Sequence, residues 1–122
     1  ELYKVKNDTS FLDLAHNIAD ATIENFVYDN GVLKDPKEPN LNGDASQFKG
    51  IFMRNLGFLY SESPKEHYKS FILNNVNSIW SFARNKTTNE VGVVWNNSSE
   101  KTNASTQSSA LDAFNAAMIV SK

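Results

Sequence analysis

The chain has 122 residues, no cysteine, and a formal net charge of −2 from 12 basic and 14 acidic residues. This length suits one modest domain with a single hydrophobic core. The balanced charge provides no basic field for nucleic acid, and no apolar stretch approaches the roughly 20 residues that span a bilayer. We therefore expect neither nucleic acid nor a membrane as a partner, and the absence of cysteine excludes disulfides and thiolate metal sites.

The N-terminal third predicts the end of one helix and the whole of a second. Glu1-Leu2-Tyr3-Lys4 is typical of the end of a helix that begins upstream. Apolar residues then recur at helical spacing over residues 9–28, namely at Leu12, Ala15, Ala19, Ile23 and Phe26. Asp29-Asn30-Gly31 tolerates a left-handed backbone, so we expect it to end this helix and open a long polar loop.

Two helices joined by a short link are predicted next, over residues 45–61 and 64–84. Asp44 is placed to cap the first of them. Ser63-Pro64-Lys65-Glu66 is a start signal for the second, because Ser63 can cap, proline suits the first helical position and the glutamate completes a capping box.

The apolar faces of these two helices predict which of their side chains are buried. Trp80 lies on the apolar stripe of residues 64–84, so we expect it in the core. Asn55 and Asn75 also fall on apolar faces, so we expect both to be buried with hydrogen-bond partners.

The C-terminal part predicts a second long polar loop and a last helix. The loop continues to about Asn103 and contains Val91–Trp95, which could form a short extended piece but no larger sheet. Alanines, Leu111 and Phe114 then predict a helix over residues 104–120. The predicted fold is all-α, with stacked antiparallel helical hairpins whose long loops gather at one end.

Ionisable residues in the loops and helices do not form a recognisable metal site. Four acids cluster around the first long loop, namely Asp29, Asp35, Glu38 and Asp44. Their spacing fits no calcium loop, so we interpret them as solvated loop acids, with Asp44 as a helix cap. His16 and His67 have no second ligand at suitable spacing. We expect no metal and no cofactor.

Three side chains at the mouth of the predicted fold suit contact with a ligand. Gln47 and Lys49 lie in the first turn of the second complete helix, where side-chain donors and unpaired backbone N–H groups face the loops. Trp95 sits in a polar loop, where its ring could stack on the apolar face of a pyranose or could close the core from above. The residues alone leave both roles open.

One long run resembles a known enzyme family. Residues 42–56, Asn-Gly-Asp-Ala-Ser-Gln-Phe-Lys-Gly-Ile-Phe-Met-Arg-Asn-Leu, resemble the most recognisable stretch in the C-terminal half of family 76 glycoside hydrolases. The order of the surrounding features is also similar: Asn30-Gly31-Val32-Leu33, the tryptophans Trp80 and Trp95, and Thr106-Gln107-Ser108-Ser109. The resemblance covers nearly all of this chain but only the last part of the family's domain.

The resemblance implies a fold, a substrate and a set of contact residues. It implies part of an (α/α)6 toroid whose groove binds α-1,6-linked mannan, in an extracellular or cell-surface protein. It also implies substrate-facing roles for Asp44, Gln47, Lys49, Trp95 and Gln107. The family's chemistry depends on two adjacent aspartates in its N-terminal half, and no two acidic residues are adjacent here.

The leading hypothesis is therefore the C-terminal portion of an endo-α-1,6-mannosidase-like glycoside hydrolase that contributes groove wall without the catalytic pair. We expect the isolated chain to be inactive and to self-associate through a helix flank left uncovered by the missing hairpins. A non-catalytic helical module that binds a glycan or a protein is the alternative, and a plain packing domain is a third reading.

Overall fold

The computed structural model describes residues 2–41, 43–98 and 101–122, and this part of the chain is helical without strands. Its helices are α1 (Leu2–Lys6), α2 (Ser10–Asn25), α3 (Phe48–Glu62), α4 (Glu66–Ser78) and α5 (Ala104–Val120). A 3-10 turn, Gly43–Gln47, precedes α3, and a π-helical turn, Ile79–Ala83, follows α4. None of these helices has the length and apolar character needed to cross a membrane.

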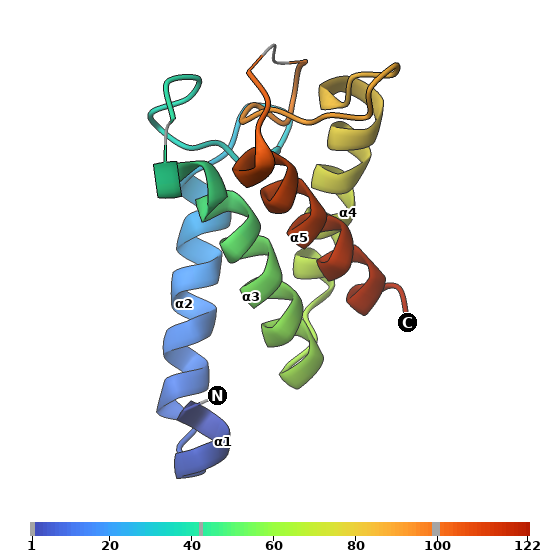
Figure 1. Cartoon of the computed structure of the whole chain (residues 1–122). Helices are drawn as coiled ribbons and strands as arrows, with labels where there is room; N and C mark the ends of the chain where they lie inside the picture. Colours follow the sequence, from blue (N-terminus) through green and yellow to red (C-terminus); the bar gives the residue numbers. More distant parts are fainter. Residues whose placement is uncertain (1, 42, 99–100) are drawn as a thin grey trace.

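Helices α2 to α5 run alternately in opposite directions (Figure 1). The first loop (residues 26–41) and the second loop (residues 84–98 and 101–103) therefore lie at one end of the molecule, which we call the loop end. The short link between α3 and α4 lies at the opposite end (Figure 1). This arrangement confirms the predicted antiparallel helical hairpins and the position of their long loops.

The core forms where α3, α4 and α5 face one another. Met53, Tyr68, Ile72 and Ala113 are completely buried there. Burial of such side chains contributes about 1.5–3 kcal/mol each for the large apolar ones. The core therefore consists mainly of side chains from α3, α5 and one face of α4.

Close contact between α3 and α5 depends on two glycines of α3. The Gly50 N–H donates to Ser109 Oγ at 2.9 Å, and a Cβ at Gly50 would lie 2.5 Å from Ser109 Cα. A Cβ at Gly57 would lie 3.2 Å from the Cα and Cβ of Ala116. Small residues on both helices thus let the two backbones approach each other.

Helix α2 ends three residues before its predicted boundary. The chain turns back after Asn25, where Lys34 N donates to Phe26 O at 2.9 Å and Tyr28 N donates to Val32 O at 2.9 Å. Gly31 adopts the expected left-handed backbone, with φ of 75°. These bonds satisfy backbone groups that a longer helix would have used.

The extended piece predicted near Val91 forms no hairpin in the described residues. Among the described residues there are two isolated antiparallel bridges, Val27 with Leu33 in the first loop and Arg84 with Val91 in the second. Each bridge closes a turn in the first part of one long loop. The second loop is therefore held mainly by contacts with the helices.

Three predictions for side chains were wrong. Ser63 does not cap α4, since Lys65 is the N-cap residue and Ser63 Oγ instead lies 3.0 Å from His16 Nε2. Asn55 is exposed and donates to Ile51 O one turn earlier. Trp80 is 56% exposed, because adjacent residues of a helix point in different directions and the neighbouring Ile79, which is fully buried, is the one that faces the core. Asn75, in contrast, is fully buried as predicted.

We expect Gly50→Ala to destabilise the chain by about 1–3 kcal/mol, because the added methyl group meets the backbone of Ser109. Gly57→Ala is the matched control, since its methyl group meets looser surroundings and gains up to about 1 kcal/mol of helix propensity. Urea denaturation followed by circular dichroism measures both. Equal stability of the two variants would contradict this account of the α3–α5 contact.

Candidate functional site

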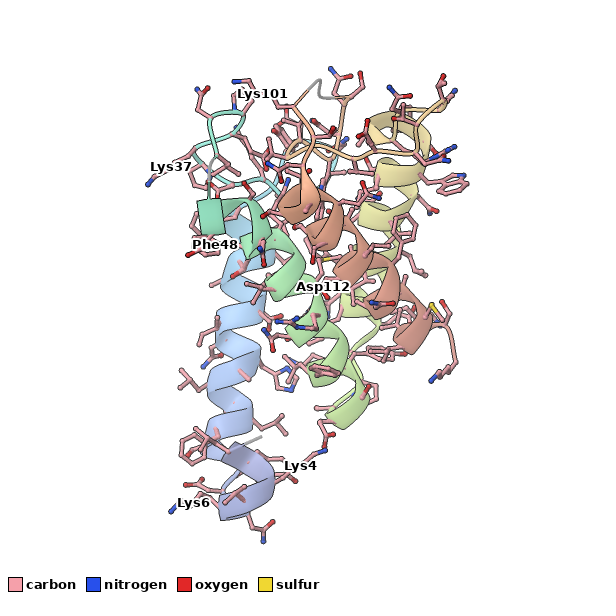
Figure 2. All side chains as sticks on the ribbon, viewed as in Figure 1. Lys4, Lys6, Lys37, Phe48, Lys101 and Asp112 are labelled. Carbon is pink, nitrogen blue, oxygen red and sulfur yellow. The ribbon has the colours of Figure 1, made fainter. Side chains whose placement is uncertain are left out.

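The loop end brings both long loops over the start of α3. Figure 2 shows Lys37 and Lys101 at this end, whereas Lys4 and Lys6 lie at the opposite end. Loops carried on a rigid helical scaffold are the usual place for contacts with ligands. The predicted site residues all belong to this end, in the turn before α3, the first turns of α3 and α5, and the second loop.

Lys49 projects from the first turn of α3 into the space beneath the two loops. Its side chain is only 6% exposed and forms an ion pair with Glu38, whose side chain is 1% exposed. The Lys49 ammonium also donates to Val93 O and, at 3.5 Å, to Leu33 O. A buried charge needs such partners, and here they come from both loops.

Glu38 was interpreted from the sequence as a solvated loop acid, and the structure corrects this. The Tyr28 hydroxyl donates to Glu38 Oε2 at 2.6 Å, and Asp35 N donates to Glu38 Oε1 at 3.1 Å. Both carboxylate oxygens are thus occupied in addition to the Lys49 contact. A lysine in the first turn of an otherwise apolar helix face was the sequence signal that a counter-ion lay nearby.

Trp95 is fully buried, and the Lys49 ammonium lies 4.5 Å from the centroid of its ring. The Trp95 carbonyl accepts a hydrogen bond from Ser78 Oγ at 2.9 Å. In the structure the ring closes the core beneath the second loop, which was one of the two roles left open. Contact between Trp95 and a glycan stays a prediction.

Burial shifts the pKa values of Lys49 and Tyr28, the two side chains that contact the Glu38 carboxylate. Burial lowers the pKa of Lys49, while the Glu38 carboxylate, followed by Asp35, acts in the opposite direction. Burial also raises the pKa of Tyr28, and its hydrogen bond to Glu38 adds to that rise. Tyr28 therefore stays protonated at neutral pH and acts as a donor to the carboxylate.

The other predicted site residues lie nearer to solvent. Gln47 Nε2 donates to Ser105 Oγ at 3.3 Å, which links the starts of α3 and α5. Gln107 Oε1 accepts from Val91 N at 3.0 Å. Asp44 is exposed in the 3-10 turn, and α3 has Gln47 rather than Asp44 at its N-cap position. The turn displaces the start of α3 from the predicted cap.

A small polar cavity of about 350 Å³ adjoins Gln107 at the loop end. It is lined by Thr88, Asn89, Glu90, Thr102, Asn103, Ala104 and Gln107. Hydroxyl, amide and carboxylate groups of this kind can donate to and accept from sugar hydroxyls. Of this set only Gln107 was predicted from the sequence as a site residue, because the cavity forms from a turn and a helix start that are separated in sequence.

Each histidine has its own hydrogen-bond partners, although both rings contact the ring of Tyr68. His16 is buried with Nδ1 2.9 Å from the Tyr68 hydroxyl, and burial lowers its pKa. His67 Nε2 lies 2.8 Å from Asp20 Oδ1. Among residues 2–41, 43–98 and 101–122, no three His, Asp or Glu side chains are grouped so that they could hold a metal ion.

Comparison with known proteins identifies the family. The model of glycosyl hydrolase family 76 matches residues 1–122. The chain belongs to this family. No protein with a curated description matches this family 76 chain significantly.

Solved structures show the fold of which this family 76 chain is a part. The Lin0763 protein from Listeria innocua aligns with a TM-score of 0.86 and 25% identity over 98% of this chain and 34% of that one. The α-1,6-mannanase GH76A of a Salegentibacter species aligns with a TM-score of 0.85 and 21% identity, over 98% of this chain and 36% of that one. A second GH76A structure gives a TM-score of 0.84, 22% identity and the same shares.

The chain thus spans about a third of the length of these structures. Its helices form the corresponding part of the (α/α)6 toroid fold, as the resemblance predicted. The two GH76A structures are of inactive variants, with two consecutive aspartates replaced, in complex with α-1,6-mannotriose and α-1,6-mannotetrose.

Proposed function

We propose that this chain is the C-terminal portion of a glycoside hydrolase that acts on α-1,6-linked mannan. The family match over residues 1–122 carries the proposal. The α-1,6-manno-oligosaccharides bound to GH76A support the substrate class, since the two chains share a fold over this third. The polysaccharide is thus the proposed partner, and an extracellular or cell-surface location would give access to it.

We propose further that this portion lacks the catalytic pair. Glycoside hydrolysis needs two carboxylates on either side of the scissile bond, one as the acid and one as the base or nucleophile. The GH76A variants were inactivated at two consecutive aspartates. None of the 14 acidic residues of this chain adjoins another. The pair would therefore lie in another part of the complete domain.

The proposed contribution of this chain is a section of the groove wall at the loop end. Asp44, Gln47 and Gln107 lie at or near the surface there, and the polar cavity next to Gln107 adds further donors and acceptors. Lys49 and Trp95 lie beneath this surface and would support the wall from below. Hydroxyl-rich ligands suit such a surface because they exchange hydrogen bonds with water for hydrogen bonds with protein.

We expect no release of reducing ends from α-1,6-mannan by the 122-residue chain, because the proposed acid and base lie outside it. In NMR spectra of the ¹⁵N-labelled chain, addition of α-1,6-mannotriose should shift the amide signals of residues at the loop end. The affinity should be weak, because part of a groove makes few contacts with the glycan. Gln107→Ala should reduce these shifts, whereas Asn115→Ala, an exposed residue on the same helix, should not.

Hydrolysis above a buffer blank would overturn the proposed absence of the catalytic pair. Shifts confined to other surfaces, or no shifts at all, would overturn the groove-wall proposal. Micromolar affinity for the glycan without hydrolysis would favour the alternative of a non-catalytic binding module.

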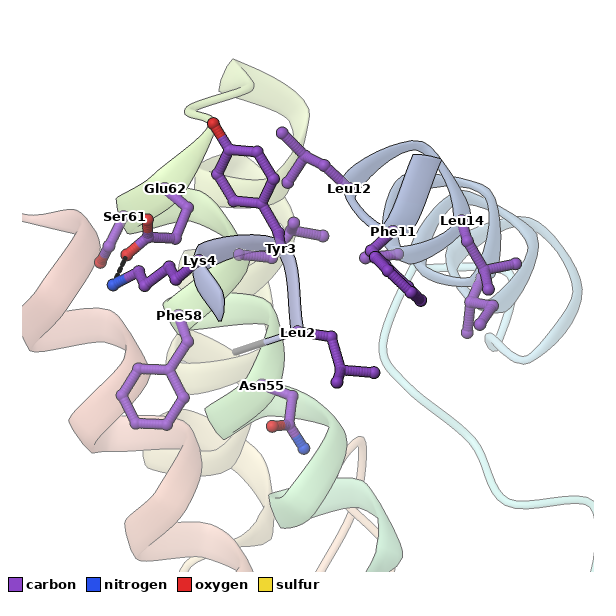
Figure 3. Close-up of a pocket in the computed structure, with 13 residues that line it drawn as sticks. Leu2, Tyr3, Lys4, Phe11, Leu12, Leu14, Asn55, Phe58, Ser61 and Glu62 are labelled. Atoms are coloured by element: carbon purple, nitrogen blue, oxygen red, sulfur yellow. Dashed lines mark ion pairs between the residues drawn. The ribbon is translucent and has the colours of Figure 1, made fainter. Parts of the chain in front are cut away.

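An apolar groove between α1, α2 and α3 is the second surface that bears on function. Its volume is about 660 Å³, and Leu2, Phe11, Leu14 and Phe58 surround it, with the Lys4–Glu62 ion pair on one side (Figure 3). Leu14 and Phe58 are 55% and 54% exposed. We propose that a neighbouring helical hairpin covers this groove in a complete toroid and that a second copy covers it in the isolated chain.

Light scattering at micromolar concentration should therefore report a dimer or larger species rather than the 13.7 kDa monomer. Leu14→Lys combined with Ile18→Lys should return the chain to the monomer, because both substitutions place charge in the groove. Asn17→Lys adds charge to an exposed site on the same helix outside the groove lining and should leave the association unchanged. A monomeric wild-type chain would contradict the proposal.

A further inference from the structure

One ammonium group contacts both long loops. The first loop joins α2 to the turn before α3, and the second loop joins the turn after α4 to α5, so the two loops belong to different helical hairpins. No backbone hydrogen bond between described residues joins one loop to the other. Lys49, on α3, belongs to neither loop. Its side chain therefore forms a link between two segments that are separate along the chain.

On the side of the first loop, the link runs through Glu38 and Leu33. Lys49 pairs with the Glu38 carboxylate and donates to Leu33 O at 3.5 Å. Tyr28 and Asp35 N hold the carboxylate from the first loop itself. Displacing this loop would leave the buried ammonium without its counter-charge, which is costly in a buried site.

On the side of the second loop, the link runs through Val93 and Trp95. Val93 O accepts from the Lys49 ammonium, and the same ammonium lies over the Trp95 ring. Both residues are buried, and the Trp95 carbonyl is held by Ser78 of α4. Displacing the second loop would remove a carbonyl acceptor and an aromatic face from the same cation.

We propose that Lys49 is a positioning residue that couples the two long loops, so that they open and close as one unit. Each loop supplies polar groups that replace part of the water lost by the buried ammonium. When either loop opens, water reaches the ammonium, and the contacts of the other loop with it then contribute less to keeping that loop closed. This coupling stands on the contacts of Lys49 and does not require glycan binding. If the loop end does bind a glycan, a ligand held by one loop would also order the other.

Native-state hydrogen exchange on the unmodified chain tests the coupling without any mutation. Leu33 N of the first loop donates to Asn75 Oδ1 of α4, and Val91 N of the second loop donates to Gln107 Oε1 of α5. Each amide therefore reports on the closure of its own loop. If the loops open together, both amides will exchange with the same opening equilibrium and the same dependence on denaturant. Different values for the two amides would overturn the proposal.

Lys49→Met tests the residue itself. It should speed exchange of the Leu33 and Val91 amides together and by the same factor, about tenfold or more. Lys49→Arg retains the positive charge and should restore protection at both amides in parallel. Lys37→Met removes an exposed lysine of the first loop and should change neither amide.

A spectroscopic measurement separates positioning from general loss of packing. In a Trp80→Phe background, Trp95 is the only tryptophan, and Lys49→Met should shift its emission because a cation 4.5 Å from the ring is removed. Faster exchange in one loop alone, or an unchanged Trp95 emission, would overturn the proposal. Failure of mannotriose binding would affect only the proposed function, because none of these measurements uses a glycan.

Discussion

A positive charge buried at the start of α3 constrains the whole loop end. The Lys49 ammonium is stable in that position only because Glu38, Leu33 and Val93 replace the water it has lost. These partners come from two loops of different hairpins. The position of each loop therefore depends on the Lys49 side chain. The shape of the surface that the two loops form depends on it as well.

The close packing of α3 against α5 places this charge correctly. Gly50 follows Lys49 directly, and its N–H donates to Ser109 Oγ, so the start of α3 is held against the first half of α5. Gln47 adds a contact with Ser105 at the same end. Backbone proximity of the two helices thus brings the second loop, which leads into α5, within reach of the Lys49 side chain.

Helical periodicity predicted the elements of this fold well, because the spacing of apolar residues in a helix is local in sequence. Contacts between distant segments could not be predicted in this way. Glu38 looked like a solvated acid because its partner lies eleven residues away on another element. Trp80 looked buried because it adjoins Ile79, and helical spacing alone did not show which of these two side chains faces the core. The family resemblance rested on residues 42–56, which contain both Lys49 and Gly50.

A double-mutant cycle on the Lys49–Glu38 pair measures how far the two buried charges depend on each other. Lys49→Met alone leaves the Glu38 carboxylate buried and should cost about 3–5 kcal/mol of unfolding free energy. Adding Glu38→Gln removes that charge while keeping an acceptor for Tyr28. We expect the double variant, measured by urea denaturation at neutral pH, to be more stable than Lys49→Met alone. Additive losses within about 0.5 kcal/mol would contradict it, because they would show that the two charges do not depend on each other.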